Sequence, residues 1–349
     1  MGNSATPMYM HAGINREKSR AARHEGNAMV PFMSAKCFTG CALVMLILSS
    51  CITRDNPFDP VNRKAHVGRT YVVSNQDSLM ARVFSALPGD TIALTAGTFR
   101  VSLRFGYSGS TSRPIVVTGA NGGSVVTAQP GLGILYLSGQ HSIHVSGVVF
   151  DSSNASGAKV ENGSSDILFE SCAFLDNSLD GLEITDSDVG AMHCTFVHNG
   201  RAGLSVNGDG SGSHAVTLDN VLSAHNTKDG ISVTAAPLAI THATISDNGN
   251  SGIVLTTPAG EVRVALSILS FNAGAGVAGL WSASTSQLVF DSLDIDSNGT
   301  AFSLSPTVSP SYWIADPMFA DRNAGDYSIG AASEIDSLQL QGIVVGYRE

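Results

Sequence analysis

The stretch Cys172–Thr185, CAFLDNSLDGLEIT, decides the fold, because it returns 22 residues later as Cys194–Asn207, CTFVHNGRAGLSVN. Both copies share a phenylalanine, an asparagine three positions later, a glycine four positions after that, and then an apolar residue. The residues between the copies are short apolar stretches with alternating polar positions. The pattern is therefore a repeat unit, and its period governs the architecture.

The asparagine–glycine pattern recurs along the middle of the chain. No segment of residues 140–305 shows a helical period of useful length, so the repeat is built from short strands. In the last copy the glycine is replaced by Ala301, three positions after the asparagine. The asparagines are spaced by 22, 27, 22, 24 and 26 residues, and they are Asn177, Asn199, Asn226, Asn248, Asn272 and Asn298.

A unit of this length cannot bury its own apolar face, but stacked copies can. Parallel strands of successive copies lie about 4.8 Å apart, which places each asparagine above the next. Their amides can then hydrogen-bond along the stack, whereas a buried amide without a partner would cost roughly 1–3 kcal/mol. The glycine suits a positive φ or a tight corner. The sequence predicts an all-β parallel solenoid with an asparagine ladder.

Segments on both sides of the repeat extend this interpretation. The run Ser85–Leu94, SALPGDTIAL, with Ala96–Phe99, AGTF, resembles the N-terminal segment of the pectin-lyase-like superfamily. Residues 315–319, 325–329 and 335–336 resemble its C-terminal coil, although the ending at 342–346 departs from the usual pattern. The resemblance covers about residues 70–346 and implies a right-handed parallel β-helix.

A capping helix is predicted at the N-terminal opening of the solenoid, where strand edges need cover. Leu79, Met80, Val83, Phe84 and Leu87 form one apolar stripe at helical spacing. Asp77 or Ser78 is the expected N-cap of this short amphipathic helix.

The first 50 residues resemble a targeting signal. The apolar run Ala42–Leu48 follows Lys36 and is shorter than the roughly 20 residues that cross a bilayer. Leu48–Cys51, LSSC, resembles the lipobox of bacterial lipoproteins, with a signal of 18 residues counted from Met33. The resemblance implies that Cys51 is acylated; the alternative is a buried apolar strand followed by a chance cysteine.

This organisation assigns residues 1–50 to an upstream segment and signal peptide, 51–69 to a tether, and 70–349 to the solenoid. We expect an exported monomer anchored through Cys51 in the bacterial cell envelope, at the outer membrane. The chain has 349 residues, of which 14% are charged, and a net charge of −10. This charge disfavours nucleic acid as a partner, since such binding needs a basic surface.

Two cysteines, Cys172 and Cys194, each lie five residues before a ladder asparagine and should stack on adjacent coils. Their predicted separation is within the range of a disulfide, and export brings an oxidising environment. Strands in register, however, point both side chains the same way. The sequence leaves buried thiols and a disulfide as alternatives.

The position before each ladder asparagine is ionisable in four successive copies: Asp176, His198, His225 and Asp247. Imidazole and carboxylate groups bind metals and carry protons, so both histidines with one aspartate are a candidate metal site. Strict strand alternation would turn this position inward, whereas its polarity favours a solvated corner.

Polar residues after the ladder glycines should form outward rows, which suit the hydroxyl groups of a polysaccharide. One row is Glu183, Ser205 and Ser232, and the next is Thr185, Asn207, Thr234 and Thr256. A second hypothesis is a uronate lyase in which carboxylates hold Ca²⁺ and basic residues neutralise the sugar acid. Its candidate residues are Glu183, Asp186, Asp188, Arg201, Asp209 and Lys228. The simplest alternative is a soluble outer face.

Three functions follow from these patterns. Polysaccharide binding comes first, and it requires no cofactor. A polysaccharide-degrading enzyme, either a Ca²⁺-assisted lyase or a glycosidase, is second, although catalytic motifs of the well-known lyases and polygalacturonases of this fold are missing. A non-catalytic structural or adhesive spacer is third. Trp281, Tyr312 and Trp313 are expected to plug ends and anchor loops more than to stack on sugars.

Overall fold

A computed structural model describes residues 66–120, 123–280, 286–305, 312–336 and 345–347. The expected signal peptide, Cys51 and most of the tether lie outside the described residues, as do Trp281 and most of the expected final strand. Within the described part, no helix has the length and apolar character needed to cross a bilayer.

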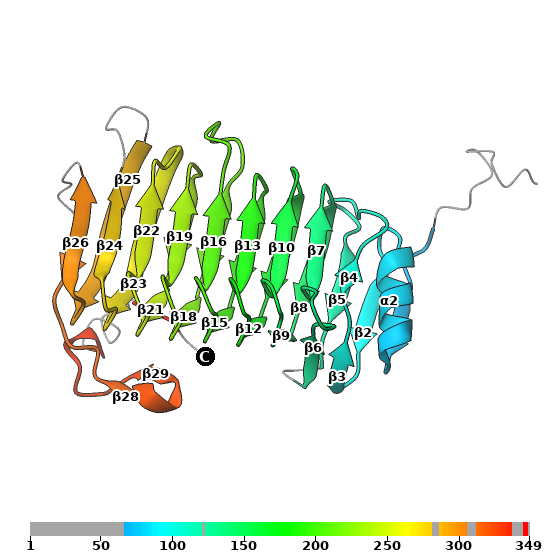
Figure 1. Cartoon of the computed structure of the whole chain (residues 1–349), viewed down its shortest axis with the longest axis horizontal. Helices are drawn as coiled ribbons and strands as arrows, with labels where there is room; N and C mark the ends of the chain where they lie inside the picture. The colour runs from blue at the N-terminus through cyan, green and yellow to red at the C-terminus, as the bar shows by residue number, and fades with distance from the viewer. Residues whose placement is uncertain (1–65, 121–122, 281–285, 306–311, 337–344, 348–349) are drawn as a thin grey trace, which may run out of the picture. The chain divides into compact units, whose positions relative to one another are not determined.

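The chain winds into a right-handed parallel β-helix (Figure 1). One side of the helix, named here the front sheet, contains nine parallel strands among the described residues. They are β4 (Leu103–Arg104), β7 (Leu135–Ser138), β10 (Ala158–Glu161), β13 (Leu182–Thr185), β16 (Leu204–Asn207), β19 (Ile231–Thr234), β22 (Ile253–Thr256), β24 (Ala275–Leu280) and β26 (Thr300–Ser305).

The remaining sides of the coils form one bent sheet, named here the back sheet. Its earlier strands are β1 (Thr70–Val73), β2 (Thr91–Leu94), β3 (Gly97–Arg100), β5 (Ile115–Thr118), β6 (Ser124–Thr127), β8 (His141–Ser146), β9 (Val148–Asp151), β11 (Ser165–Glu170) and β12 (Ala173–Leu175). Its later strands are β14 (Val189–Met192), β15 (Thr195–Val197), β17 (Val216–Asp219), β18 (Leu222–Ala224), β20 (Leu238–Thr241), β21 (Thr244–Ser246), β23 (Gly260–Ser270), β25 (Ser286–Asp296) and β27 (Tyr312–Trp313).

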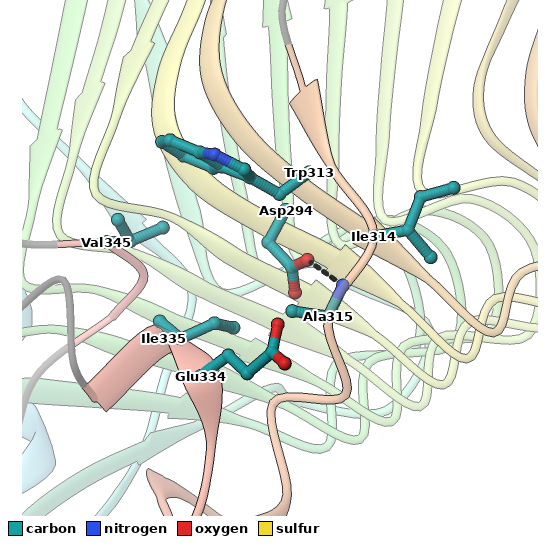
Figure 2. A pocket seen from close by; sticks show the side chains of 7 residues that line it. All are labelled: Asp294, Trp313, Ile314, Ala315, Glu334, Ile335 and Val345. Atoms are coloured by element: carbon teal, nitrogen blue, oxygen red, sulfur yellow. Dashed lines mark hydrogen bonds between the residues drawn. The ribbon is translucent and has the colours of Figure 1, made fainter.

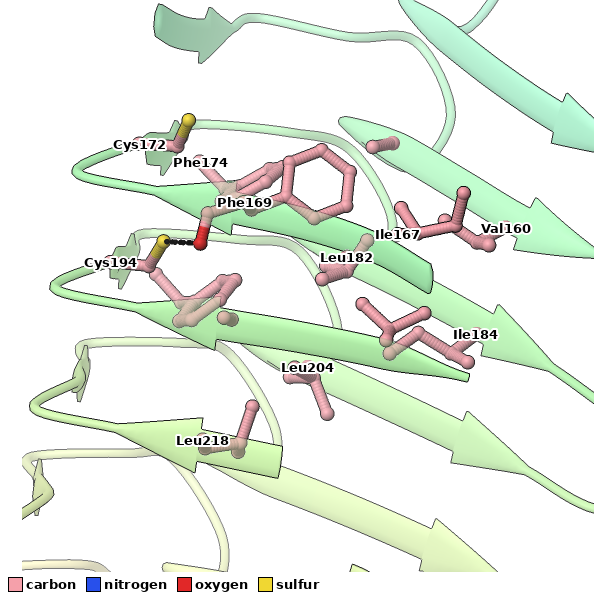
Figure 3. Close-up of a cluster of buried hydrophobic side chains, with 14 of the residues drawn as sticks. Val160, Ile167, Phe169, Cys172, Phe174, Leu182, Ile184, Cys194, Leu204 and Leu218 are labelled. Carbon is pink, nitrogen blue, oxygen red and sulfur yellow. Dashed lines mark hydrogen bonds between the residues drawn. The ribbon is translucent and has the colours of Figure 1, made fainter. Parts of the chain in front are cut away.

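Alternate residues of these strands fill a continuous apolar core. Phe150, Phe174 and Phe196 stack on successive coils, with ring centroids 5.0 Å apart in each pair. Cys172 and Cys194 lie beside them as buried free thiols (Figure 3). Each thiol donates to a main-chain carbonyl of the preceding coil, Val145 and Phe169 respectively, at 3.5 Å. The structure therefore shows the thiol alternative.

The asparagine ladder is confirmed. Each Nδ2 donates to Oδ1 of the next asparagine at 2.8–2.9 Å, from Asn177 through to Asn298. The same Oδ1 also accepts from the preceding asparagine's main-chain N–H, at 3.0 Å between Asn199 and Asn226. Ser153 replaces asparagine at the N-terminal end, where its N–H donates to Asn177.

The glycine of the repeat serves close packing and not a positive φ. The left-handed residue is the one before the asparagine, such as His225 with a φ of 54°. A Cβ on Gly230 would lie 2.4 Å from Ile245 Cγ2 and 2.9 Å from Asn248 Nδ2. Only glycine therefore leaves room for the asparagine of the next coil.

Helix α2 (Gln76–Ser85) covers the N-terminal end of the β-helix, as predicted (Figure 1). Two details of the prediction were wrong. The N-cap is Asn75, whose side chain accepts from the Ser78 N–H at 2.9 Å. Leu79 and Val83 are buried, but Phe84 is 63% exposed, so it does not belong to the face that covers the opening.

The Pro88-Gly89-Asp90 motif fixes the first coil. Asp90 is buried, and its carboxylate accepts from the main-chain N–H groups of Leu87 and Arg69, each at 2.9 Å. It also lies 2.6 Å from His66 Nε2. Burial opposes ionisation, but these hydrogen bonds hold the pKa of Asp90 below its ordinary value. The described end of the expected tether is thus tied to the first coil.

The segment that resembled a C-terminal coil is an antiparallel hairpin. Strand β28 (Phe319–Asp321), the 3-10 turn η1 (Arg322–Ala324) and β29 (Asp326–Ile329) form this C-terminal hairpin. It folds back beside the coils instead of stacking as a further one (Figure 1). Tyr327 packs on Leu222 and Ala224, about one hundred residues earlier in the chain. Long-range apolar contact, which the local pattern does not encode, decides this placement.

Candidate functional site

The outward rows of the front sheet exist in the predicted register. Glu183 pairs with Ser205, and Ser205 with Ser232, on β13, β16 and β19. Thr185, Asn207, Thr234 and Thr256 form the neighbouring row. On β13 and β19 the apolar residues face the core and the polar ones are partly exposed, whereas Ser205 on β16 is buried, with 5% of its surface exposed.

The structure extends the first row through three earlier coils that the asparagine pattern does not mark. Arg104, Tyr136 and Lys159 lie in register before Glu183. The Arg104 guanidinium lies 4.4 Å from the centroid of the Tyr136 ring, and the Tyr136 hydroxyl accepts from the Gly133 N–H at 2.9 Å. The missed signal was the alternation Leu135-Tyr136-Leu137.

Lys159 forms ion pairs with two glutamates on this face. Its Nζ lies 3.2 Å from Glu161 Oε2 and 3.3 Å from Glu183 Oε1. The Ser156 hydroxyl donates to the other oxygen of Glu183 at 2.8 Å. Partial burial by itself would lower the pKa of Lys159. The two glutamates outweigh this effect and raise the pKa above its ordinary value. Lys159 is therefore a fixed cation between two carboxylates.

The basic residues predicted for a lyase lie in the ladder turns at the start of the front strands. The Lys228 N–H donates to the Arg201 carbonyl at 2.9 Å, so the two residues stack on adjacent coils. The Arg201 guanidinium lies 3.6 Å from Asp180. Asp180 is buried, and burial raises its pKa, although the Ala202 N–H and Arg201 oppose the rise.

The predicted loop carboxylates lie at the other end of β13 and β16. Asp186 follows β13 with a φ of 46°. Asp188 accepts from the Ala215 N–H at 2.9 Å and lies 3.6 Å from His214. Asp209 is exposed and accepts from the Ser211 N–H within its own loop, at 2.8 Å. The structure thus separates the six predicted lyase residues into three places along the front face and its two borders.

The row Asp176, His198, His225 and Asp247 faces outward, and the C-terminal hairpin covers part of it. The His198 and His225 rings stack with centroids 5.3 Å apart, and His198 Nδ1 lies 3.9 Å from Asp176. The Tyr327 hydroxyl lies 2.9 Å from His225 Nε2 and donates to Asp247 at 3.0 Å. Across the described ranges, no three His, Cys, Asp or Glu side chains gather in a way that could hold a metal ion. The metal assignment remains a prediction without a described ligand set.

A pocket of about 430 Å³ lies where the C-terminal segment covers the end of the back sheet (Figure 2). Asp294 of β25 is fully buried in its wall, and Oδ1 accepts from the Ala315 N–H at 2.9 Å. Burial, with the Asp296 and Asp316 carboxylates, raises the pKa of Asp294 to about 7, although the Ala315 hydrogen bond opposes the rise. The pocket is lined by Asp294, Trp313, Ile314, Ala315, Glu334, Ile335 and Val345.

Sequence reasoning missed this pocket. Asp294 is one alternating residue among many, and its neighbours come from segments 19 to 51 positions further along the chain. Trp313 was expected to plug an end of the solenoid; it does lie near that end, but 38% of it is exposed and it lines the pocket.

Comparisons with known proteins agree with this architecture. The family model for the right handed beta helix region matches residues 132–293. A comparison with curated proteins gives no match. The crystal structure of pectate lyase Pel9A aligns with a TM-score of 0.60 and 16% identity, over 77% of this chain and 91% of that chain.

Two other solved structures align less closely. The alginate lyase from Paenibacillus sp. str. FPU-7 has a TM-score of 0.48 and 15% identity, over 70% of this chain and 98% of that chain. The periplasmic alginate epimerase AlgG has a TM-score of 0.46 and 13% identity, over 65% of this chain and 59% of that chain. At such identities, the likeness to Pel9A establishes the fold alone.

Proposed function

We propose that this protein binds a polysaccharide along the outward rows of its front sheet. The observation that carries the proposal is the row Tyr136, Lys159, Glu183, Ser205 and Ser232, held in register on five successive strands. Parallel strands repeat about every 4.8 Å, so Tyr136, Lys159 and Glu183 offer polar groups at regular steps, as a repeating polymer requires. Ser205 is buried, and the exposed part of the row resumes at Ser232. The fold shared with a pectate lyase supports the same class of partner.

Each member of the row has a role that suits sugar recognition. The half-buried Tyr136 ring is held by Arg104 on one side and Gly133 on its hydroxyl, so it offers a rigid aromatic edge. Lys159 donates to hydroxyl or carboxylate oxygens, and Glu161 and Glu183 accept from hydroxyl groups. Ser232, Thr234 and Thr256 beyond them extend the same contacts without adding charge.

The binding hypothesis is favoured over the lyase hypothesis by the placement of the candidate residues. A lyase would need its base, its neutralising cation and its Ca²⁺ ligands around one sugar ring. Arg201 pairs with Asp180 in a ladder turn, whereas Asp188 and Asp209 lie beyond the opposite end of the front strands.

Affinity electrophoresis tests the proposal. Purified protein is run through gels that contain pectate, alginate, xylan or dextran, and we expect retardation by at least one polymer. Lys159→Met keeps the aliphatic stem but removes the charge, and it should weaken retardation at least fivefold. Lys228→Met, in the turn outside the row, is the matched control and should leave retardation unchanged.

Two outcomes would reject the proposal: no retardation by any polymer, or equal retardation of Lys159→Met and the unaltered protein. Absorbance of unsaturated uronate, followed in parallel with and without Ca²⁺, would instead support the lyase alternative.

An exported, lipid-anchored location through Cys51 is part of the same proposal. Its support is the LSSC sequence at Leu48–Cys51 after an apolar run. Incorporation of a labelled fatty acid in a bacterial host should be lost in Cys51→Ser, and labelling that persists in this variant would reject the anchor.

A further inference from the structure

The Asp294 pocket contains an acidic group whose hydrogen bonding is incomplete. Oδ1 of Asp294 accepts from Ala315, but the buried Oδ2 has no partner among the described residues. Buried polar atoms in native proteins are almost always paired, so an unpaired oxygen in the wall of a pocket points to a missing donor.

The surroundings of this oxygen favour a donor that carries positive charge. The described lining includes the carboxyl groups of Asp294 and Glu334 and no lysine, arginine or histidine. Asp296 and Asp316 add negative potential at Asp294. A cation in the pocket would therefore reduce the electrostatic repulsion among these carboxylates.

The walls suit the carbon body of a small molecule. Trp313, Ile314, Ile335 and Val345 supply apolar surface, and Figure 2 shows Asp294 between Trp313 and Glu334. An indole face attracts a nearby cation as well as apolar groups. A volume of about 430 Å³ lies within the range of small-molecule sites, about 300–1,000 Å³.

We propose that this pocket binds a small ligand with a primary ammonium group, such as a hexosamine unit. The ammonium donates to Asp294 Oδ2, while the ring packs against Trp313. The site goes beyond the proposed function, because it lies on the back sheet under the C-terminal segment. It shares no residue with the outward row of the front sheet from Tyr136 to Ser232.

The raised pKa of Asp294 gives this mode of binding a second signature. Near neutral pH the carboxyl is partly protonated, and an ammonium ion favours its ionised form, so binding releases a proton. The other charged groups that act on Asp294 are Asp296 and Asp316, both of the same sign.

Calorimetric titration with D-glucosamine and N-acetyl-D-glucosamine tests the proposal, because the two share a ring and only the first is charged. We expect glucosamine to bind at least tenfold more tightly, with proton release at pH 7 visible as a dependence of the enthalpy on the buffer. Asp294→Asn should weaken glucosamine binding at least tenfold. The matched control is Asp291→Asn, an exposed residue of the same strand β25, which should leave it unchanged.

Trp313→Leu provides an independent variant should Asp294→Asn fail to fold, and it should also weaken binding. Equal affinity for the two sugars, undiminished binding by both pocket variants, or no binding of glucosamine at millimolar concentration would overturn the proposal. Lys159→Met should not affect glucosamine binding. Failure of the proposed polysaccharide binding on the front sheet and failure of this proposal are therefore distinguishable.

Discussion

At the scale of single residues, the backbone angle before each ladder asparagine explains why ionisable residues gather there. Asp176, His198, His225 and Asp247 have φ values of 52–58°. Aspartate and histidine are among the non-glycine residues most often found in this left-handed region. The turn ends strand alternation and directs the side chain outward, which the alternation rule alone gets wrong. The left-handed backbone therefore explains why these four positions are polar, without a bound metal.

The ladder predicts a large effect of one substitution. Asn226→Leu removes the acceptor of two Asn199 groups, the main-chain N–H and Nδ2, inside the core. It also removes the donor to Asn248 Oδ1. Each buried group left unpaired costs roughly 1–3 kcal/mol, so we expect the free energy of unfolding to fall by about 3 kcal/mol or more.

Urea denaturation followed by circular dichroism measures this change. Asn154→Leu is the matched control, because Asn154 is exposed and makes only a 3.4 Å hydrogen bond to the Gln129 carbonyl. A loss for Asn226→Leu no larger than that for Asn154→Leu would mean that the ladder contributes little to stability.

At the scale of elements, the C-terminal hairpin is held to the coils by a small polar network under an aromatic cluster. The Tyr327 ring lies against Phe319, and Arg322 lies over Phe271 and 3.4 Å from Asp247. Burial and the Asp247 carboxylate raise the pKa of Tyr327, so its hydroxyl stays protonated and donates to Asp247. The same hydroxyl then accepts from His225 Nε2, which assigns the hydrogen of that ring.

Tyr327→Phe should loosen the C-terminal hairpin without unfolding the coils. It removes two hydrogen bonds of Tyr327 and keeps its ring packing, so we expect amide exchange within 319–329 to speed up about tenfold. Exchange in the ladder coils should not change. Tyr312→Phe, whose ring packs on Phe302, is the control. A uniform increase along the β-helix would show that the C-terminal hairpin and the coils unfold as one unit.

At the scale of the whole molecule, stability should depend on pH through Asp294. Its pKa is raised from an ordinary 3.8 to about 7, so the folded state binds more protons than the unfolded state between these values. The contribution of Asp294 to the free energy of unfolding is therefore largest below about pH 4, and it is lost as the pH rises to about 7. Three pKa units correspond to at most about 4 kcal/mol.

Asp294→Asn should remove this dependence. The variant and the unaltered protein should unfold at similar urea concentrations at pH 4, and the variant should be the more stable at pH 8. Urea titrations across this range measure the difference, with Asp291→Asn as the control. Parallel pH profiles for Asp294→Asn and the unaltered protein would contradict the burial of an uncompensated carboxyl.

The sequence by itself determined the coil, because period, alternation and the asparagine–glycine spacing are local properties that every stacked copy repeats. The register of Glu183, Ser205 and Ser232 follows from that period. The row predicted from the sequence did not include Lys159. Its coil has Ser153 in place of the asparagine that marks the repeat.

Only the tertiary structure decided the Asp294 pocket and the docking of the C-terminal hairpin. Both depend on segments that do not repeat and that return to coils formed much earlier, as Tyr327 does to His225 and Val345 does to Ile268. Such contacts depend on the shapes of two separate surfaces, and no spacing along the chain records them. The repeat therefore encodes the β-helix, whereas the packing of its non-repeating end creates the buried acid.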